Sequence, residues 1–259
     1  MDVDSFLNYI KTLPWYHDQI AHLEPLAPRN MVSGTLNVPL DPTIVDALES
    51  VGITHLYKHQ ADSIDAIRSG GNVIVSTSAA SGKSLCYNVP IVEDLLTDRS
   101  ARAIYLFPTK ALAQDQAQSL STLVSDFKHL RIGIFDGDTS QSDRTQIRRN
   151  ARILLTNPDM LHLGILPNHK MWYAFIKNLK YIVVDEAHIY RGVFGSHVAN
   201  VIRRLVRLCR IFGVVPQFIL CSATISNPGE HAVRLVGKEF QVRSEERRVG
   251  KECRSRWSP

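Results

Sequence analysis

The sequence predicts a largely parallel, doubly wound α/β sheet with helices on both of its faces. Short runs rich in β-branched and aromatic residues alternate with segments of helical spacing, a pattern typical of such sheets. Polar loop residues follow several of these runs, at the strand ends where a parallel sheet binds its ligands. At 259 residues, with 44% hydrophobic and 21% charged residues, the chain can form one large α/β domain or two small ones.

Residues 1–40 mix aromatic, proline and polar side chains without regular periodicity. They are predicted to form an accessory arm with one short helix at residues 5–12. A helix is predicted next, because Asp41 is a capping residue, Pro42 suits the first helical position and Gly52 suits the end. Another helix is predicted to begin at residue 59 and to stop at the paired glycines that follow residue 69.

The main domain is predicted to span residues 41–242. Helical spacing between its strands is clear at residues 112–123. A helix at residues 195–210 has apolar residues on one face and arginines on the other, and this basic face is predicted to be solvated rather than bound to DNA. The six predicted strands lie at residues 72–76, 103–107, 131–135, 152–156, 181–184 and 217–221.

The segment TSAASGKS, residues 77–84, nearly matches the phosphate-loop pattern G-x-x-x-x-G-K-[S/T], with Thr77 at the first glycine position. A strand, a loop of small residues and a helix surround it, so backbone N–H groups and a helix N-terminus can face an anion. Lys83 is placed to reach the terminal phosphates, and Ser84 to ligate Mg²⁺. The predicted nucleotide-binding residues of this loop are Thr77, Ser78, Ala79, Ala80, Ser81, Gly82, Lys83 and Ser84.

The segment YIVVDEAHIY places Asp185 and Glu186 directly after an apolar strand. An acid at a strand end near a phosphate loop can hold Mg²⁺ through water. Glu186 is placed to orient and deprotonate the attacking water. We therefore predict Lys83, Asp185 and Glu186 as catalytic residues, and Ser84 and Asp185 as metal ligands. A solvated acidic turn is the alternative interpretation, which the phosphate loop disfavours.

A third motif, SAT at residues 222–224, also follows an apolar strand. The order GKS, DEAH, SAT resembles the first motor domain of superfamily 2 helicases, the DEAD/DEAH-box group. That group commonly has Ala or Thr where Thr77 stands, whereas Ala80 departs from its usual glycine. The resemblance implies a RecA-like P-loop domain that binds ATP and Mg²⁺ and hydrolyses ATP. It also implies that three residues couple the nucleotide state to a second motor domain: His188, Ser222 and Thr224.

The segment LYKHQADSI resembles the upstream element whose glutamine reads the adenine edge in this group. By this resemblance Gln60 contacts adenine and Tyr57 is a stacking partner. A glutamine amide offers one donor group and one acceptor group, which suits the exposed edge of adenine.

Three strand ends resemble the motifs that hold the nucleic-acid backbone: FPTKALAQDQ, DGDT and TNPDML. There a hydroxyl, an ammonium group and a helix N-terminus can bind phosphate. Asp138 and Asp159 are predicted to be structural caps rather than phosphate ligands. The implied partner is single-stranded or partly unwound DNA, and RNA is the less favoured alternative. The predicted contacts are Pro108, Thr109, Lys110, Gly137, Thr139, Thr156, Asn157 and Pro158.

Longer strings, such as YRGVFGSHVANVIRRL and SATISNPGEHA, are similar to one branch of the group. It comprises bacterial and fungal DNA-repair helicases related to the RecQ4-like group, with a cysteine-rich C-terminal domain. The resemblance covers roughly residues 10 to 240, and it implies an ATP-dependent DNA helicase of the bacterial cytosol that associates with the nucleoid on DNA. A nucleic-acid-stimulated translocase, an RNA helicase and a non-catalytic binding fragment stay open as alternatives.

Composition constrains the class of protein only broadly. The net charge is +5, and more than half of it comes from residues 243–259, so overall charge is weak support for a polyanionic partner. No apolar run is long enough to cross a membrane, and the acidic start does not have the pattern of a secretory signal. The four cysteines show no C-x-x-C spacing, which supports neither a zinc site nor a disulfide framework.

The final segment, RSEERRVGKECRSRWSP, differs from everything before it in its dense mixture of charges. It resembles the translation of a sequencing-library adapter, and residues 243–259 are therefore predicted to be a non-native, disordered tail. The family continues at this point into a second RecA-like domain, which we expect to be missing from this chain. The chain as given is accordingly expected to be inactive or weakly active in hydrolysis, without unwinding.

Overall fold

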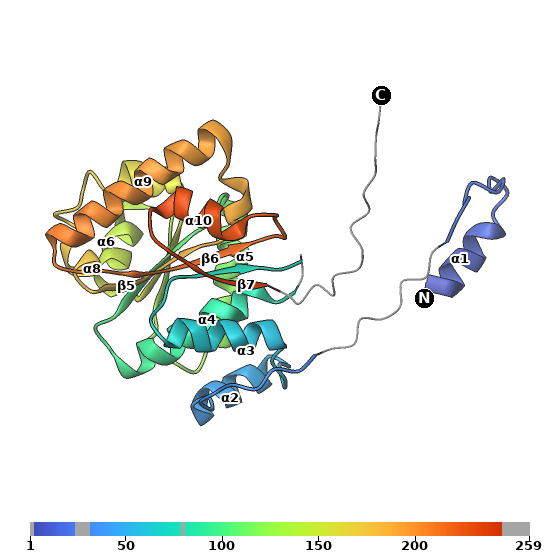
Figure 1. Cartoon of the computed structure of the whole chain (residues 1–259), viewed down its shortest axis with the longest axis horizontal. Helices are drawn as coiled ribbons and strands as arrows, with labels where there is room; N and C mark the ends of the chain where they lie inside the picture. The colour runs from blue at the N-terminus through green and yellow to red at the C-terminus, as the bar shows by residue number, and fades with distance from the viewer. Residues whose placement is uncertain (1–2, 24–31, 79–80, 245–259) are drawn as a thin grey trace. The chain divides into compact units, whose positions relative to one another are not determined.

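The computed structural model describes residues 3–23, 32–78 and 81–244 and has a parallel sheet at its centre (Figure 1). In the described residues the sheet has seven strands in the order β3-β4-β2-β5-β6-β1-β7, and all paired neighbours are parallel. The predicted fold class is confirmed. The strands are β1 (Val73–Ser76), β2 (Arg102–Leu106), β3 (Ile132–Phe135), β4 (Ile153–Thr156), β5 (Leu179–Val184), β6 (Gln217–Ser222) and β7 (Gln241–Ser244).

Both faces of the sheet are covered, which explains why six of its seven described strands are apolar runs in the sequence; β7, at the edge, is mostly exposed. In β1, Val73 and Val75 belong to one core cluster, whereas Ile74 belongs to the other. The first cluster is completed by α2 (Pro42–Ser50), α3 (Lys58–Arg68), α4 (Lys83–Thr97) and α5 (Lys110–Leu123). The second is completed by α6 (Gln141–Asn150), α7 (Pro158–Met160), the π-helix η1 (Leu161–Ile165), α8 (Tyr173–Ile176), α9 (Gly192–Ile211) and α10 (Pro228–Val236).

Local capping chemistry places the helices close to their predicted positions. The Asp41 carboxylate accepts a hydrogen bond from the Thr43 N–H at 2.9 Å, and Pro42 is the first residue of α2. Gly52 follows that helix with φ +80°, a backbone conformation that favours glycine. The predicted short helix near the start of the chain is α1 (Val3–Lys11). None of the described helices has the length and apolar character needed to cross a membrane.

The chain divides into two compact units, Met1–Met31 and Val32–Pro259. Arg243 and Ser244, the first two residues of the predicted tail, belong to β7 and pair with Val75 and Ser76 of β1. The remaining predicted tail, residues 245–259, lies outside the described residues, as does part of the predicted arm at residues 24–31.

The first turn of helix α9 packs closely against the backbone of Tyr190, which precedes the helix. Gly195 is buried, and a Cβ added there would overlap the backbone carbonyl of Tyr190. We expect Gly195→Ala to lower the free energy of unfolding by about 1–3 kcal/mol, because backbone must move to admit the methyl group. Urea unfolding measures this loss. Ser196→Ala, at the exposed next position, is the matched control and should change stability by less than about 0.5 kcal/mol; equal stabilities for both variants would contradict the packing argument.

Candidate nucleotide and nucleic-acid site

The three predicted nucleotide motifs meet at one edge of the sheet. Strands β1, β5 and β6 are parallel neighbours, so their carboxyl ends lie side by side. The Thr77 N–H donates to the carbonyl of Ser222 at 3.3 Å, and the Ser76 hydroxyl donates to the carbonyl of Ala223 at 3.3 Å. The phosphate loop, the acidic turn after β5 and the SAT segment are therefore adjacent, as the sequence predicts.

The phosphate loop leads directly into α4. Gly82 precedes the helix with φ +71°, and Lys83 is the first helical residue. The Lys83 ammonium donates to the carbonyl of Ser78 at 2.9 Å, and the hydroxyls of Thr77 and Ser81 lie 2.6 Å apart. The described residues on either side of positions 79–80 therefore contact each other at two points. Ser84 is half-buried in the first turn of α4, while Ala79 and Ala80 lie outside the described residues.

Gln60 links α3 to this loop. Its side-chain oxygen accepts from the Tyr57 N–H at 2.8 Å, and its side-chain nitrogen donates to the carbonyl of Gly82 at 3.1 Å. Both ends of the amide that the sequence assigns to adenine are thus bonded to protein, and the side chain is buried. Gly82 also leaves room for it, because an added Cβ would lie 2.5 Å from the Gln60 nitrogen.

Tyr57 and His59 flank the glutamine. The two rings stack with centroids 5.7 Å apart and 12° between their planes, and Tyr57 is 37% exposed. The His59 Nε2 lies 3.0 Å from the carbonyl of Ser81, so α3 contacts the phosphate loop at two positions. Sequence reasoning did not select His59, although it lies between two residues that it did select.

Asp185 is buried at the end of β5 and is held by two donors. The Tyr87 hydroxyl donates to one carboxylate oxygen at 2.9 Å, and the Glu186 N–H donates to the other at 2.8 Å. Burial raises the pKa of Asp185 to about 6. This effect outweighs the two hydrogen bonds, each of which lowers the pKa. Tyr87 is a site residue that sequence reasoning missed. Its position one helical turn after Lys83 was the available signal, because such residues share a helix face.

The acidic turn has a left-handed residue and a bridging histidine. Glu186 has φ +49°, an uncommon conformation for a residue other than glycine that turns the chain sharply after β5. The His188 Nδ1 lies 3.2 Å from the Ala223 N–H and 3.2 Å from the Glu186 carboxylate. The first contact requires an unprotonated nitrogen and the second a protonated one, so Nδ1 makes one of them at a time.

The SAT segment places its two hydroxyl side chains differently. The Ser222 hydroxyl is buried and donates to the carbonyl of Ala223 at 2.7 Å, within its own turn. Thr224 is exposed. Of the predicted coupling residues, Thr224 is therefore at the surface, whereas His188 joins the acidic turn to the SAT segment.

The ends of β2, β3 and β4 form the edge predicted to hold nucleic acid. Thr109 caps α5 by accepting from the Leu112 N–H at 3.3 Å, and it is exposed beside the half-buried Pro108. The Lys110 ammonium is paired with the Asp138 carboxylate at 2.8 Å, and this hydrogen bond raises the pKa of Lys110. Gly137 is exposed next to this pair.

The capping roles differ from those predicted from the sequence. Asp136, not Asp138, organises the DGDT turn: one of its carboxylate oxygens accepts from the N–H groups of Asp138 and Thr139 and from the Thr139 hydroxyl. Asn157, not Asp159, caps α7 by accepting from the Met160 N–H at 2.8 Å. Thr139 itself is half-buried within this turn.

Two of the predicted nucleic-acid contacts lie inside the protein. Thr156 is 1% exposed, and its hydroxyl donates to the carbonyl of Phe135 at 2.6 Å, which joins β4 to β3. Pro158 is buried as well. The structure therefore corrects these two assignments to structural roles. Of the three contacts predicted in that segment, Asn157 is half-buried and the other two are buried.

Comparisons with known proteins show the family of this chain. The profile of the DEAD/DEAH box helicase family matches residues 57–231. The chain is 44% identical over 227 residues to the uncharacterized ATP-dependent helicase YprA of Bacillus subtilis, covering 87% of this chain and 30% of that protein. It is 46% identical over 244 residues to the ATP-dependent helicase hrq1 of Schizosaccharomyces pombe, covering 91% of this chain and 23% of that protein. The chain thus spans less than a third of the length of these relatives.

Solved structures give the same result. The DUF1998 helicase MrfA bound to DNA and AMPPNP is 42% identical, with a TM-score of 0.84, covering 93% of this chain and 34% of that chain. The DEAD-box helicase Mss116 bound to ssRNA and UDP-BeF has a TM-score of 0.67 over 78% of this chain and 42% of that chain. At 20% identity, this second similarity supports the fold alone.

Proposed function

Because the chain belongs to the DEAD/DEAH box helicase family, we propose that it is the ATP-binding motor domain of an ATP-dependent DNA helicase. The observation that carries this proposal is the meeting of Lys83, Asp185 and Ser222 at one edge of the sheet. The similarity to a helicase bound to DNA and AMPPNP supports DNA and ATP as ligands. A strand-displacement assay with the full-length protein tests the activity: ATP-dependent separation of a DNA duplex is expected, and its absence would favour a translocase.

ATP would bind with its phosphates at the start of α4. The N-terminal N–H groups of this helix and the Lys83 ammonium supply positive charge at one place. Lys83 would exchange the Ser78 carbonyl for phosphate oxygens, and a charge-assisted hydrogen bond to phosphate is the stronger of the two. Tyr57, which is 37% exposed, would stack on the adenine beside the loop. Gln60 would contact the adenine edge only after releasing one of its two hydrogen bonds to Tyr57 and Gly82.

Ser84 and Asp185 have the donor chemistry that Mg²⁺ requires. Mg²⁺ prefers oxygen ligands and commonly takes one or two protein ligands together with phosphates and water. When bound, the ion would neutralise charge on the phosphates of ATP. Tyr87 and the Glu186 N–H orient the Asp185 carboxylate for this role.

Glu186 would accept the proton of the attacking water. Its side chain is 31% exposed, so water can reach it, and the left-handed turn separates it from the buried Asp185. His188 lies between Glu186 and the Ala223 N–H, and a change of its partner from one to the other would connect the base to the SAT segment. Thr224 and Ser222 would pass that change to a second motor domain in the full-length protein, where hydrolysis would drive movement along DNA.

Single-stranded DNA would cross the ends of β2, β3 and β4, in the cytosol and nucleoid of a bacterial host. Thr109, Lys110, Gly137 and Asn157 are the accessible groups there, and they suit the sugar-phosphate backbone rather than base edges. Weak base specificity and strong salt dependence follow from such contacts.

Substitutions in the Lys110–Asp138 pair test whether DNA binds at this edge, because they should change the DNA affinity in opposite directions. Lys110→Ala should weaken single-stranded DNA binding about equally for all sequences and flatten the salt slope by about one unit. Asp138→Asn should strengthen binding by about two- to fivefold, because it frees Lys110 from an exposed ion pair of modest strength. Fluorescence anisotropy at several salt concentrations measures both. Equal binding by both variants would place the DNA elsewhere.

A further inference from the structure

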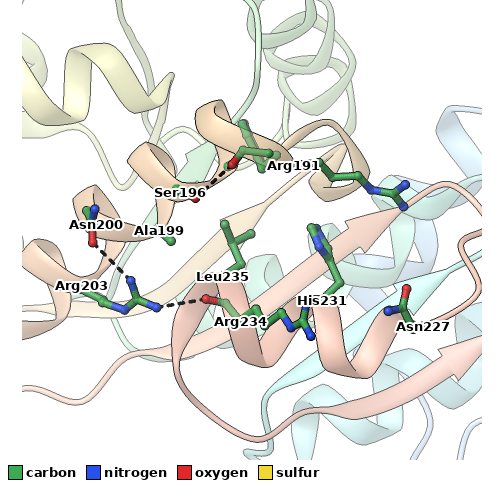
Figure 2. Close-up of a pocket in the computed structure, with 12 residues that line it drawn as sticks. Arg191, Ser196, Ala199, Asn200, Arg203, Asn227, His231, Arg234 and Leu235 are labelled. Atoms are coloured by element: carbon green, nitrogen blue, oxygen red, sulfur yellow. Dashed lines mark hydrogen bonds between the residues drawn. The ribbon is translucent and has the colours of Figure 1, made fainter.

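A groove lies between α9 and α10, outside the residues assigned to ATP and to single-stranded DNA (Figure 2). Its volume is about 570 Å³, which is in the size range of ligand sites. Arg203 reaches from α9 to the carbonyl of Arg234 on α10 at 3.1 Å and to the Asn200 side chain at 3.2 Å, so the groove wall is held in place. Its polar lining residues are Arg191, Ser196, Asn200, Arg203, Asn227, His231 and Arg234.

Positive charge in this groove is mostly uncompensated. Of the residues that the structure describes, the lining includes three arginines and a histidine but no aspartate or glutamate. Arg234 is paired with Glu230. No carboxylate in the described part of the chain pairs with Arg191 or Arg203. A cavity that holds unpaired guanidinium groups and no acid favours an anionic ligand.

The charge continues along α9 as a stripe. Ser196, Asn200, Arg203, Arg207 and Arg210 recur every three or four residues, which places them on one helix face. All five are exposed, and the sequence of α9 includes no acid. A solvated helix face more commonly mixes the two signs of charge. The stripe from Ser196 to Arg210 is about 21 Å long, the length of several phosphate intervals along a nucleic-acid strand.

We propose that the α9–α10 groove and the α9 stripe bind the phosphodiester backbone of a second stretch of nucleic acid. The linear repeat of charge fits a polymer of phosphates better than a single carboxylate. Serine and asparagine beside arginine are also typical phosphate and sugar contacts. The amino ends of α9 and α10 add N–H groups, because neither has a side-chain cap. This inference rests on the proposed function, since it extends the DNA contacts of the same domain.

The groove is connected to the nucleotide site. The His231 Nε2 lies 2.8 Å from the carbonyl of Ala187, within the acidic DEAH turn, while the histidine also lines the groove. Arg191 follows the same turn closely in the chain. A phosphate held by Arg191 and beside His231 would therefore contact both sides of the turn that carries Glu186.

The test uses the chain as given and a fluorescent DNA oligonucleotide, as a single strand and as a duplex, over a series of salt concentrations. Arg191→Gln combined with Arg203→Gln should weaken binding of at least one form about tenfold at low salt. It should also flatten the salt slope by about two units. Arg204→Gln is the matched control: this neighbour also lies on α9 but contacts His162 instead of the groove, and its binding should stay within about twofold of the unmodified chain.

Further variants separate charge from folding. Arg203→Lys keeps the charge and should keep most of the affinity. Arg191→Gln alone, whose side chain anchors no part of α10, should flatten the slope by about one unit. Thermal unfolding of each variant checks that the fold is kept.

Three outcomes would overturn the inference. In the first, the double variant binds like Arg204→Gln while Lys110→Ala weakens binding; the groove is then not a DNA site, and the proposed function stands. In the second, neither set of variants alters DNA binding, and both the groove and the edge at Lys110 are excluded as DNA sites. In the third, the double variant loses binding to polyglutamate but keeps DNA binding, and the occupant is an acidic protein segment.

Discussion

Lys83→Ala should lower the affinity of this chain for Mg–ATP by at least about 30-fold, equivalent to roughly 2 kcal/mol. The reason is that the substitution removes the ammonium group at the start of α4 whose Nζ already lies on the phosphate loop, 2.9 Å from the Ser78 carbonyl. Isothermal titration with ATP measures the loss. Adenosine should bind the variant and the unmodified chain alike, because it has no phosphates for Lys83 to hold.

Lys110→Ala is the matched control for this experiment. It removes the same charge from the carboxyl edge of the same sheet, at the start of α5 rather than α4. ATP affinity should be unchanged in this variant, and both variants should unfold at a similar temperature. If a folded Lys83→Ala chain bound ATP as tightly as the unmodified chain, the phosphate loop would not be the ATP-binding site.

Glu186→Gln should separate binding from hydrolysis in the full-length protein. The amide keeps the shape of the side chain but cannot accept the proton of the attacking water, so hydrolysis should slow by about 100-fold or more. ATP affinity should change by less than about threefold, since Lys83 and Asp185 are untouched. Steady-state phosphate release and titration with ATP give the two values.

Glu49→Gln serves as the control for charge, because Glu49 is an exposed carboxylate on α2, a helix that supplies no residue of the proposed site. It should hydrolyse ATP at the normal rate. A normal rate for Glu186→Gln would mean that another group accepts the proton, and the assignment of Glu186 would be wrong.

Local signals in the sequence were sufficient for most of the architecture. Asp41, Pro42 and Gly52 mark the ends of α2 because capping chemistry acts over a few residues. Five of the six predicted strands are buried at most positions, and β3 is buried at alternate positions, so each is visible in the sequence as an apolar run. Strand β7 was missed because it is mostly exposed, and because its pairing partner β1 lies far from it in the chain.

In the site, too, the sequence predicted the features that depend on neighbouring residues but not those that depend on contacts between distant segments. Lys83, Asp185 and Glu186 follow strands directly, so their meeting at one edge is a consequence of a parallel sheet. The burial of Thr156 depends on its hydrogen bond to Phe135 in the adjacent strand, which no local pattern reports. The two bonds of the Gln60 amide likewise depend on how α3 packs against the phosphate loop.

The groove between α9 and α10 could not be predicted from helical spacing alone. The spacing of the arginines on α9 is visible in the sequence, and it predicts a basic face. Tertiary packing decides which of these residues meet. It brings Arg203 into contact with α10 and places Arg191 and His231 in the same groove. Sequence reasoning therefore could not distinguish the groove arginines from Arg204, which contacts His162.

A crystal structure of this chain with a non-hydrolysable ATP analogue and Mg²⁺ would show directly whether the nucleotide binds at the phosphate loop. We expect the terminal phosphates on the Lys83 ammonium and the first N–H groups of α4, with the ion beside Ser84 and Asp185. The Lys83 contact to the Ser78 carbonyl should then be replaced by contacts to phosphate. A nucleotide bound elsewhere on the domain, such as the α9–α10 groove, with Lys83 still on Ser78, would contradict the account.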